Sequence, residues 1–333
     1  MINFKYKIRL IPETTGEREM HLYGHEIKRG ERKTVILPVS NDISLEVICC
    51  CGERPGKTLV LTSGVHGCEY VGVETLKRLS NTLEPKKLTG NVVLLPIANP
   101  SGFFEAAKRV VPEDKINLNR AFPGRKEGSL SSRIAWVIEH ALYPAADFLA
   151  DLHSGDGDEA LRPLVFFPVA GEEKVNQQSL SAAKVLTVPY RVRSSAKNGL
   201  YSWAVQQGIP AVLIERGGMG LWSEAEVRDC EADVYALMRF LNILEDRNDI
   251  PQENEKQQEV TAVVYQEAQH TGFWYPEIHP DDRISKGQLL GRMENSSGKI
   301  IQKVIADFDG IVLYHNTALG IQRGELLVAY GRI

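Results

Sequence analysis

The fold of this chain is decided by residues 59–70, Leu-Val-Leu-Thr-Ser-Gly-Val-His-Gly-Cys-Glu-Tyr. The leucine- and valine-rich start predicts a buried strand. The two glycines that follow let the backbone turn sharply and approach a bound ligand closely. Apolar residues at helical spacing then predict a helix over about 69–83. His66 and Glu69 are therefore expected in a strand-to-helix loop, at the sheet edge where ligands bind in open α/β folds.

His66 and Glu69 suit a single zinc ion, because imidazole nitrogen and carboxylate oxygen are both zinc ligands. A catalytic zinc takes three protein ligands and keeps one position open for water. The best third candidate is His153, which ends an apolar run just before a polar, glycine-containing turn. Since two strand ends of one sheet can meet at the same edge, we predict one Zn²⁺ per chain at these three side chains.

Five segments, spread in order over about half of the chain, carry a resemblance to a known family. They are GVHGCE at 64–69, NPSGF at 99–103, NLNRAFPG at 117–124, DLH at 151–153 and IERGG at 214–218. Together they resemble the succinylglutamate desuccinylase/aspartoacylase branch of the carboxypeptidase-like zinc metallohydrolases. The resemblance implies the zinc carboxypeptidase-like fold, hydrolysis of carbon–nitrogen amide bonds, and a small substrate that bears a carboxylate.

The order of the expected elements indicates an α/β fold with a mixed central sheet. Strand patterns occur at 58–64, 92–97, 164–167 and 211–214, and helix patterns at 69–83, 130–142, 173–185 and 223–244. Such alternation implies a mostly parallel or mixed sheet with helices on both faces. We predict a catalytic domain over residues 1–247, which begins with a β segment at 1–57.

The C-terminal quarter has a different pattern of polar, apolar and turn residues. Residues 248–259 are polar and non-periodic, which is typical of a linker. From 260 to 333, strand-like runs alternate with Gly and Asp turns and no helix pattern occurs, so we predict a small all-β domain. Its sequence pattern resembles that of the lipoyl/biotinyl-type barrel-sandwich. The comparable turn at 295–299 has no clear carrier-lysine motif, so we expect a β cap that leans on the catalytic domain.

Two residues are candidates for the chemistry. Glu215 ends an apolar strand, so its carboxylate would lie at the same edge as the zinc ligands, and the matching glutamate of the family is the general base. Capping of the next helix or pairing with Arg216 are the structural alternatives. Arg109 is our choice for stabilising the oxyanion of the tetrahedral intermediate. Lys115 is the second choice, and a solvated surface arginine is the structural alternative.

The resemblance also implies a binding site for the substrate. Asn119 and Arg120 match the family pair that binds a substrate carboxylate, which a guanidinium fork fits well; anchoring of the loop is the alternative. Tyr201 is the nearest match where acetylaspartate-cleaving members carry a further arginine, so the acyl group and the amine stay open. Asp151 shares a strand face with His153, and it either orients that ligand or makes a structural hydrogen bond.

Composition excludes several classes of partner. The net charge of −4 over 333 residues gives no electrostatic case for nucleic acid or an anionic membrane. The N-terminus lacks a signal-peptide run, and no window approaches the ~18 apolar residues of a membrane span. Three of the five cysteines are consecutive, at 49–51, and alternate between strand faces, which suits small buried residues better than a disulfide or metal set. We expect a reduced, cytoplasmic protein, with homo-oligomerisation left open.

Three functions remain in competition. The first is zinc-dependent hydrolysis of the amide bond of an N-acyl amino acid or related small acylated amine, by a metal-bound water with Glu215 as general base. The second is a zinc carboxypeptidase that acts on peptides, and the third is a zinc- or ligand-binding protein without catalysis. The β cap favours the first, because it would narrow the cleft to small substrates. The complete set of candidate residues disfavours the third.

Overall fold

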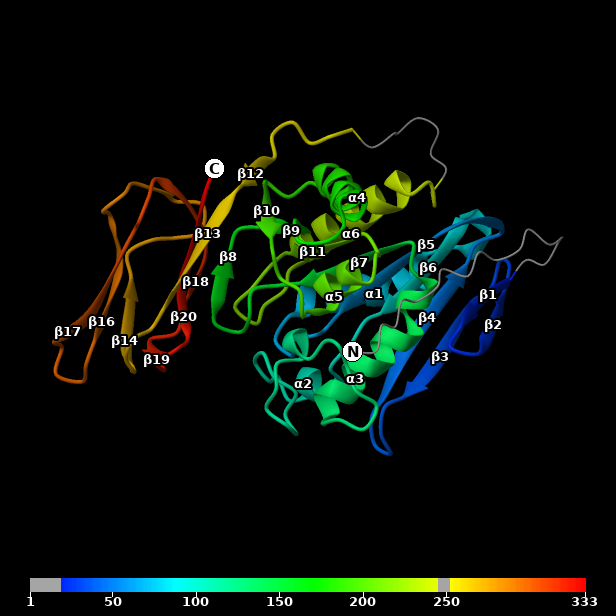
Figure 1. The fold of residues 1–333 in the computed structure, drawn as a ribbon, viewed down its shortest axis with the longest axis horizontal. Helices are drawn as coiled ribbons and strands as arrows, with labels where there is room; N and C mark the ends of the chain where they lie inside the picture. The colour runs from blue at the N-terminus through cyan, green and yellow to red at the C-terminus, as the bar shows by residue number, and fades with distance from the viewer. Residues whose placement is uncertain (1–18, 245–251) are drawn as a thin grey trace.

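The computed structural model describes residues 19–244 and 252–333 (Figure 1). Its centre is a nine-stranded mixed sheet, as predicted. The strands follow one another in the order β12 (Gln258–Val260), β10 (Tyr190–Ser194), β9 (Leu164–Pro168), β11 (Ala211–Glu215), β7 (Phe148–His153), β5 (Arg54–Ser63), β6 (Thr89–Leu95), β4 (Ser44–Cys51) and β3 (Arg32–Pro38). The neighbours β6, β5, β7 and β11 are parallel, so their carboxyl ends meet at one edge.

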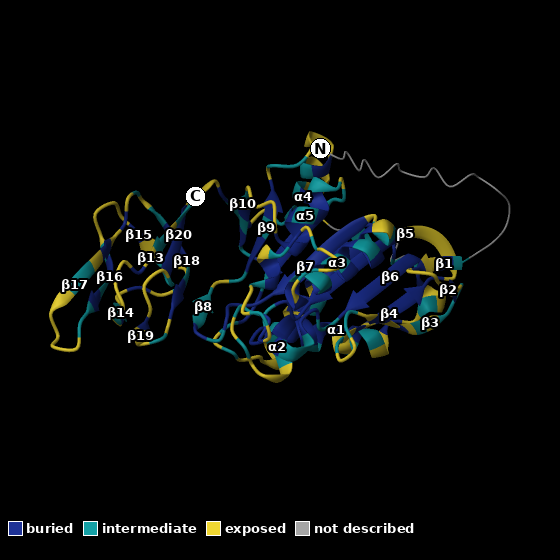
Figure 2. Cartoon of the chain, turned by 60° about the horizontal axis from the view of Figure 1, so that its bottom comes forward, coloured by how far each residue is buried: buried dark blue, intermediate teal, exposed yellow. Residues whose placement is uncertain are grey.

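Helices cover both faces of this sheet, which confirms the predicted fold class. One face packs against α1 (Tyr70–Thr82), α4 (Glu173–Lys184) and α6 (Glu224–Phe240), and the other against α3 (Leu130–Ala141) and α5 (Leu200–Gln206). Successive strand residues point to opposite faces. Accordingly Val60 of β5 belongs to one apolar core, whereas its neighbours Leu59 and Leu61 belong to the other. Figure 2 shows the strands of the large sheet as the most deeply buried part of the chain.

The strand and helix that flank the decisive loop follow the sequence pattern closely. β5 ends at Ser63, and α1 begins at Tyr70 with Glu69 as its N-cap residue. The run Cys49–Cys51 lies in β4, and all three side chains are fully buried with free thiols, which confirms their interpretation as small buried residues. A short hairpin of β1 (Glu19–Leu22) and β2 (His25–Lys28) begins the described chain.

The C-terminal part is all antiparallel β, as predicted. One sheet has the order β13 (Ala262–Glu267), β20 (Leu326–Arg332), β18 (Gly310–Asn316) and β15 (Arg283–Ile284), and the other has β17 (Ile300–Ile305), β16 (Leu289–Glu294), β14 (Gly272–Pro276) and β19 (Gly320–Ile321). The two sheets enclose their own core around Trp274 and Tyr330. In Figure 2 the hairpin of β16 and β17 carries exposed residues at the end remote from the large sheet.

Two strands tie the parts together. Within the segment predicted as a linker, residues 258 and 259 belong to β12, which adds a parallel edge strand to the large sheet beside β10. β8 (Glu159–Leu161) leaves the catalytic part and pairs antiparallel with β18 of the C-terminal sheet. The sequence patterns predict neither strand, because both are three residues long and form only through partners distant in the chain.

An apolar cluster seals this junction. It combines residues of β9, β10 and β12 with residues of β18: Leu164, Tyr190, Val192, Val260, Ile311 and Leu313. Burial of these side chains removes apolar surface from water, which stabilises the contact. Among residues 19–244 and 252–333, no helix is long and apolar enough to cross a membrane.

Candidate metal centre and active site

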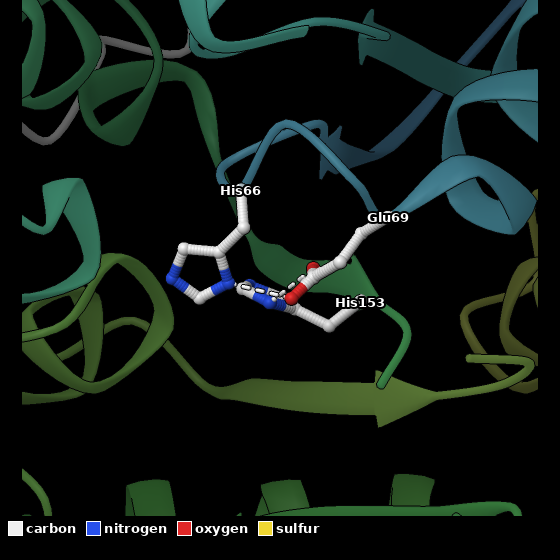
Figure 3. Close-up of side chains that lie close together, drawn as sticks. All are labelled: His66, Glu69 and His153. Carbon is white, nitrogen blue, oxygen red and sulfur yellow. Dashed lines mark hydrogen bonds and ion pairs between the residues drawn. The ribbon is translucent and has the colours of Figure 1, made fainter. Parts of the chain in front are cut away.

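His66, Glu69 and His153 meet at the carboxyl edge of the sheet, and Figure 3 shows the three side chains converging. One candidate ligand atom from each lies within 4.8 Å of the others. The loop that carries His66 needs glycine at two points. Gly64 adopts φ +64°, and a Cβ on Gly67 would come within 2.0 Å of the carbonyl oxygen of Gly102.

The Glu69 carboxylate bridges the two imidazoles. Its Oε1 lies 2.6 Å from His66 Nδ1, and its Oε2 lies 2.8 Å from His153 Nδ1. Oε2 is buried, and its contact with His153 lacks hydrogen-bond geometry. Two imidazole nitrogens and one such carboxylate oxygen form the donor set of a catalytic zinc. The residues present therefore fit a zinc ion, which Nδ1 of both histidines and the carboxylate of Glu69 would hold.

The other ring nitrogens fix the orientation of both imidazoles. His153 Nε2 lies 3.0 Å from Asp151 Oδ2, and Asp151 Oδ1 accepts a hydrogen bond from Thr62 Oγ1 at 2.7 Å. His66 Nε2 lies 3.2 Å from Asn117 Oδ1. Because each Nε2 faces an oxygen acceptor, the tautomer with its proton on Nε2 is favoured by these contacts, and in that tautomer Nδ1 would be available to a metal. Asp151 thus occupies the orienting position, and Asn117 has a matching one that sequence reasoning missed.

Charge and burial compete at these ligands. Burial alone would raise the pKa of Glu69, but the two imidazoles outweigh it and lower that pKa to about 2. Burial alone would lower the pKa of His153, but Glu69 and Asp151 outweigh it and raise that pKa well above the usual value. A metal ion binds the neutral imidazole, so we expect metal binding at His153 to depend on pH.

Glu215 stands beside the cluster. It is the register partner of His153 across the parallel pair β11–β7. Burial raises its pKa well above the usual value, and the carboxylates of Glu69 and Asp151 add to the rise against the opposing effect of His153. Its Oε2 is buried without a hydrogen bond to any described residue. Such an atom is costly unless it serves a ligand or a proton transfer.

Neither structural alternative for Glu215 is found among the described contacts. The next helix, α6, is capped by Ser223, whose side chain accepts a hydrogen bond from the backbone of Glu226. Arg216 pairs instead with the fully buried Asp233, at 2.7 Å from Nε to Oδ2. The carboxylate of Glu215 is therefore left to the site.

Arg109 is not a solvated surface arginine. Its Nε donates to Asp156 Oδ2 at 2.8 Å, and its Nη2 donates to Glu159 Oε1 at 2.7 Å. Lys115, the second choice for the same role, has an exposed side chain. Both residues have positive φ, +58° and +59°, so the loop between them is irregular.

The residues expected to bind substrate differ in exposure. Asn119 is buried, and its Oδ1 accepts a hydrogen bond from the backbone of Leu200 at the start of α5. Its side-chain amide nitrogen has no hydrogen bond with a described residue. Arg120 is exposed and forms no ion pair within the described chain; its Nη1 donates to the carbonyl oxygen of Asn119. Tyr201 lies buried in the core beneath α5.

The C-terminal domain brings two tyrosines that sequence reasoning missed. Tyr265 on β13 and Tyr314 on β18 share a hydrogen bond, and Tyr265 is 51% exposed. The charges of Arg120 and Glu215 both act on Tyr265, so this side chain of the C-terminal domain faces the candidate site. No local signal could have found these residues, since they reach the site only through the packing of two domains.

Comparison with known proteins agrees with this geometry. Residues 55–241 match the model of the succinylglutamate desuccinylase/aspartoacylase catalytic domain. A curated N-alpha-acetyl-L-2,4-diaminobutyric acid deacetylase of Halomonas elongata is 27% identical over 89% of this chain and 90% of its own length.

Solved structures share the fold over 91% of this chain. The product-bound ectoine utilization protein EutE (DoeB) of Ruegeria pomeroyi has TM-score 0.81 and 25% identity, covering 91% of this chain and 95% of its own. A succinylglutamate desuccinylase/aspartoacylase of Rhodobacter sphaeroides, 21% identical over 91% of this chain and 94% of its own, also has TM-score 0.81 and supports the fold.

Proposed function

The chain belongs to the succinylglutamate desuccinylase/aspartoacylase family, and from this premise we propose that it hydrolyses the amide bond of an N-acyl amino acid or a related small acylated amine. The observation that carries the proposal is the convergence of His66, Glu69 and His153, with Glu215 next to them on the adjoining strand. Each of these residues comes from the same sheet edge, where the chemistry of an α/β enzyme is expected.

The proposed cofactor is one zinc ion per chain, held by His66, Glu69 and His153. Bound there, zinc would supply Lewis-acid polarisation and an acidified water. The protein's part is to fix the ligands: Asp151 and Asn117 hold the imidazole rings so that both Nδ1 atoms face Glu69. The five free cysteines are consistent with a reduced, cytoplasmic protein.

Glu215 is the proposed general base. Its carboxylate has a buried, unpartnered oxygen beside the ligand cluster, and in its deprotonated form it can accept the proton of the attacking water. The same carboxyl can then deliver that proton to the leaving nitrogen. A raised pKa suits this double task, because it makes the carboxylate a stronger base toward the proton of the water, while the carboxyl remains acidic enough to protonate an amine nitrogen.

Arg109 is proposed to stabilise the oxyanion. Its Nε and Nη2 are engaged by carboxylates, whereas Nη1 forms no hydrogen bond with a described residue. A cationic donor whose direction is fixed in a largely buried site stabilises developing negative charge more than a freely moving cation does. Lys115, exposed on the same loop, is the alternative donor.

Arg120 and Asn119 are proposed to bind the carboxylate of the substrate. Arg120 has an exposed guanidinium without an ion pair among the described residues, and the amide nitrogen of Asn119 beside it is also without a partner. A guanidinium fork and an amide donor together match the two oxygens of a carboxylate. Tyr201 is buried on α5, next to Leu200, whose backbone nitrogen donates to Asn119, and it would support this pair rather than contact the substrate directly.

The identity of the relatives narrows the first substrates to try. The Halomonas relative is a deacetylase of N-alpha-acetyl-L-2,4-diaminobutyric acid. Where acetylaspartate-cleaving members carry a further arginine, the nearest match in this chain is Tyr201, which would not favour an amino acid with an acidic side chain. We therefore propose an acetylated amino acid with a neutral or basic side chain as the leading candidate. The peptidase alternative is less favoured, because the tyrosines of the C-terminal domain stand at the site.

The experiment that tests the proposal measures free amine released by the zinc-loaded protein. The panel comprises N-acetyl and N-succinyl derivatives of acidic, neutral and basic amino acids, N-alpha-acetyl-2,4-diaminobutyrate among them, and a second panel of short peptides. The Glu215→Gln variant is the blank. We expect turnover of a small N-acyl amino acid that the blank lacks. Turnover of peptides alone would support the hypothesis of a zinc carboxypeptidase. Zinc binding without any turnover would support the hypothesis of a zinc- or ligand-binding protein without catalysis.

A further inference from the structure

Three carboxylates of one short segment surround the guanidinium of Arg109. Asp156 and Glu159 accept its Nε and Nη2 at 2.8 and 2.7 Å, and Asp158 Oδ1 lies 3.5 Å from Nη2. The side chain of Asp156 is 2% exposed and that of Glu159 15% exposed. Removal of one partner from such a buried ionic contact is strongly destabilising for the group that remains. We call Asp156 and Glu159 the clamp.

The clamp determines where Arg109 can point. With Nε and Nη2 both engaged, the planar guanidinium has lost its freedom to rotate, and Nη1 is the nitrogen without a described partner. The backbone of Arg109 adds to this, because it is held at φ +58°, a conformation that a residue with a side chain adopts only when its surroundings enforce it. The clamp lies next to the metal centre: the charges of His66 and Glu69 act on Asp156, and that of Glu69 on Glu159.

The clamp is in turn held by the C-terminal domain. Glu159 is the first residue of β8, where it is the register partner of Asn316 on β18. One residue earlier, the carbonyl oxygen of Asp158 accepts two hydrogen bonds from Thr317, from its backbone nitrogen at 2.7 Å and from its hydroxyl at 3.0 Å. The segment that grips Arg109 is therefore an added strand of the second domain's sheet.

We propose that Glu159 and Asp156 are positioning residues that aim Arg109 at the reacting carbonyl, and that the C-terminal β domain holds them in place through β8. The inference rests on the proposed function. It gives the C-terminal domain a task beyond the capping expected from the sequence, because the domain would then set the geometry of a catalytic cation more than 100 residues away in the sequence.

Two opposing effects of the clamp make the proposal testable. The carboxylates reduce the positive potential of Arg109, which by itself would weaken oxyanion stabilisation. They also fix its direction, and a displacement of about 1 Å in a catalytic group can cost about 100-fold in rate. If positioning dominates, loss of Glu159 lowers kcat. If charge reduction dominates, loss of Glu159 raises kcat.

The kinetic test is a double-mutant cycle in the zinc-loaded protein with the best substrate of the panel. We expect Arg109→Ala to lower kcat about 100-fold and Glu159→Gln to lower it about tenfold, with KM within about threefold of the parent. In the double variant, Glu159→Gln should add less than about twofold to the loss from Arg109→Ala, since it acts through Arg109. Independent, multiplicative losses, or a rise in kcat, would overturn the proposal.

A matched control separates the clamp from the loss of any buried glutamate. Glu259 also pairs with two arginines, Arg191 at 3.0 Å and Arg193 at 2.6 Å, and its side chain is 21% exposed. Glu259→Gln lies on the outer edge of the large sheet, remote from the metal centre. It should leave kcat within about twofold of the parent. An equal loss of kcat in Glu259→Gln and Glu159→Gln would mean that the effect of Glu159 is general destabilisation.

A second readout does not depend on turnover. The side-chain Nε–H of Arg109, assigned in the NMR spectrum by its absence in Arg109→Lys, should exchange slowly with solvent in the parent protein. Exchange should be at least about tenfold faster in Glu159→Gln. Thr317→Pro, which removes both hydrogen bonds to Asp158, should accelerate it as well, and Thr317→Val serves if the proline variant does not fold. Unchanged exchange in these variants would sink the proposal even if the enzyme is active; protected exchange in an inactive parent would sink only the proposed function.

Discussion

The floor and the wall of the candidate site are built in different ways. The floor consists of residues at or just after the ends of neighbouring parallel strands: His66, Glu69, His153 and Glu215. The wall consists of residues from an irregular loop and from the second domain: Arg109, Arg120, Tyr265 and Tyr314. Of the floor residues, Glu69 and His153 are buried and His66 and Glu215 are half-buried, whereas Arg120 and Tyr265 of the wall are exposed.

This difference in construction bears on which step of the proposed reaction each part would serve. The hydrogen-bonded register of the sheet fixes the positions of the floor residues. This suits a metal site, because a metal ion needs fixed ligand geometry. The wall is held by side-chain contacts across a domain junction, where a few substitutions can change shape and charge without disturbing the sheet. The metal and the general base would thus belong to the floor, whereas the wall would supply Arg109 for the oxyanion and determine the choice of acyl group and amine.

The largest effect should come from weakening the floor below the ligands. In Asp151→Asn the carboxylate that faces His153 Nε2 is replaced by an amide, so the imidazole loses its charged acceptor, and one amide oxygen cannot accept from both His153 and Thr62. We expect zinc affinity to fall by about 10- to 100-fold, measured by competition with a chelator of known affinity. Thr62→Val, which removes only the hydrogen bond to the other oxygen of Asp151, should have a smaller effect. Unchanged affinity in Asp151→Asn would mean that the floor does not depend on this support.

The next effect sharpens the role of the wall. Arg120→Ala should raise KM about tenfold for a substrate with a free carboxylate, because a charge-assisted pair is lost at an exposed position, and it should change kcat little. The parent enzyme with the matching carboxamide substrate is the control, and Arg120→Ala should not weaken its binding further. Steady-state kinetics on both substrates give the comparison. A fall in kcat alone would assign Arg120 to the floor's chemistry instead.

A smaller effect is expected from the second domain's contribution to the wall. Tyr265→Phe removes the hydroxyl that bonds to Tyr314 and keeps the ring. A neutral hydrogen bond contributes about 1 kcal/mol, so we expect a change of about threefold to fivefold in kcat/KM, with a different factor for each acyl group in the panel. Tyr275→Phe, on β14 of the outer sheet, is the matched control. A uniform loss over all substrates would argue against a role in selectivity.

The smallest effect concerns the anchoring of the loop between Arg109 and Arg120. Asp114 accepts hydrogen bonds from the backbone and hydroxyl of Ser131 at 2.8 and 2.7 Å. Burial works against its charged form, but these hydrogen bonds prevail and lower its pKa below the usual 3.8. A carboxyl with a lowered pKa binds fewer protons when folded, so its stabilisation is present above about 3.8 and is lost as pH falls through the folded-state value.

We therefore expect Asp114→Asn to lower the free energy of unfolding by about 0.5 kcal/mol at pH 7. The difference from the parent should shrink as pH falls below 3.8, the usual pKa of this carboxyl. Urea unfolding of the metal-free proteins at several pH values measures it. A difference that grows toward low pH would have the wrong sign for this contact.

The sequence predicted most of the floor and little of the wall. His66, Glu69, His153 and Glu215 each follow an apolar strand pattern, so their shared edge could be inferred before any coordinates existed. Arg109 was selected for its charge, but nothing in its neighbourhood in the sequence indicates the carboxylates that hold it. The predicted linker at 248–259 showed no sign of β12, since an edge strand of three residues carries too short a pattern to recognise.

By itself, the sequence determined the fold class, the main strands and helices of the catalytic part, and the set of side chains that could bind a metal. These features depend on hydrophobic periodicity and on short spacings between residues, and both can be recognised within a short stretch of sequence. The tertiary structure alone decided how β8 joins the second domain, which acids hold Arg109 and which tyrosines face the site. Those contacts join residues about 50 to 160 positions apart. They exist because two domains bury a shared apolar cluster, and the free energy of that burial has no signature in any local stretch of sequence.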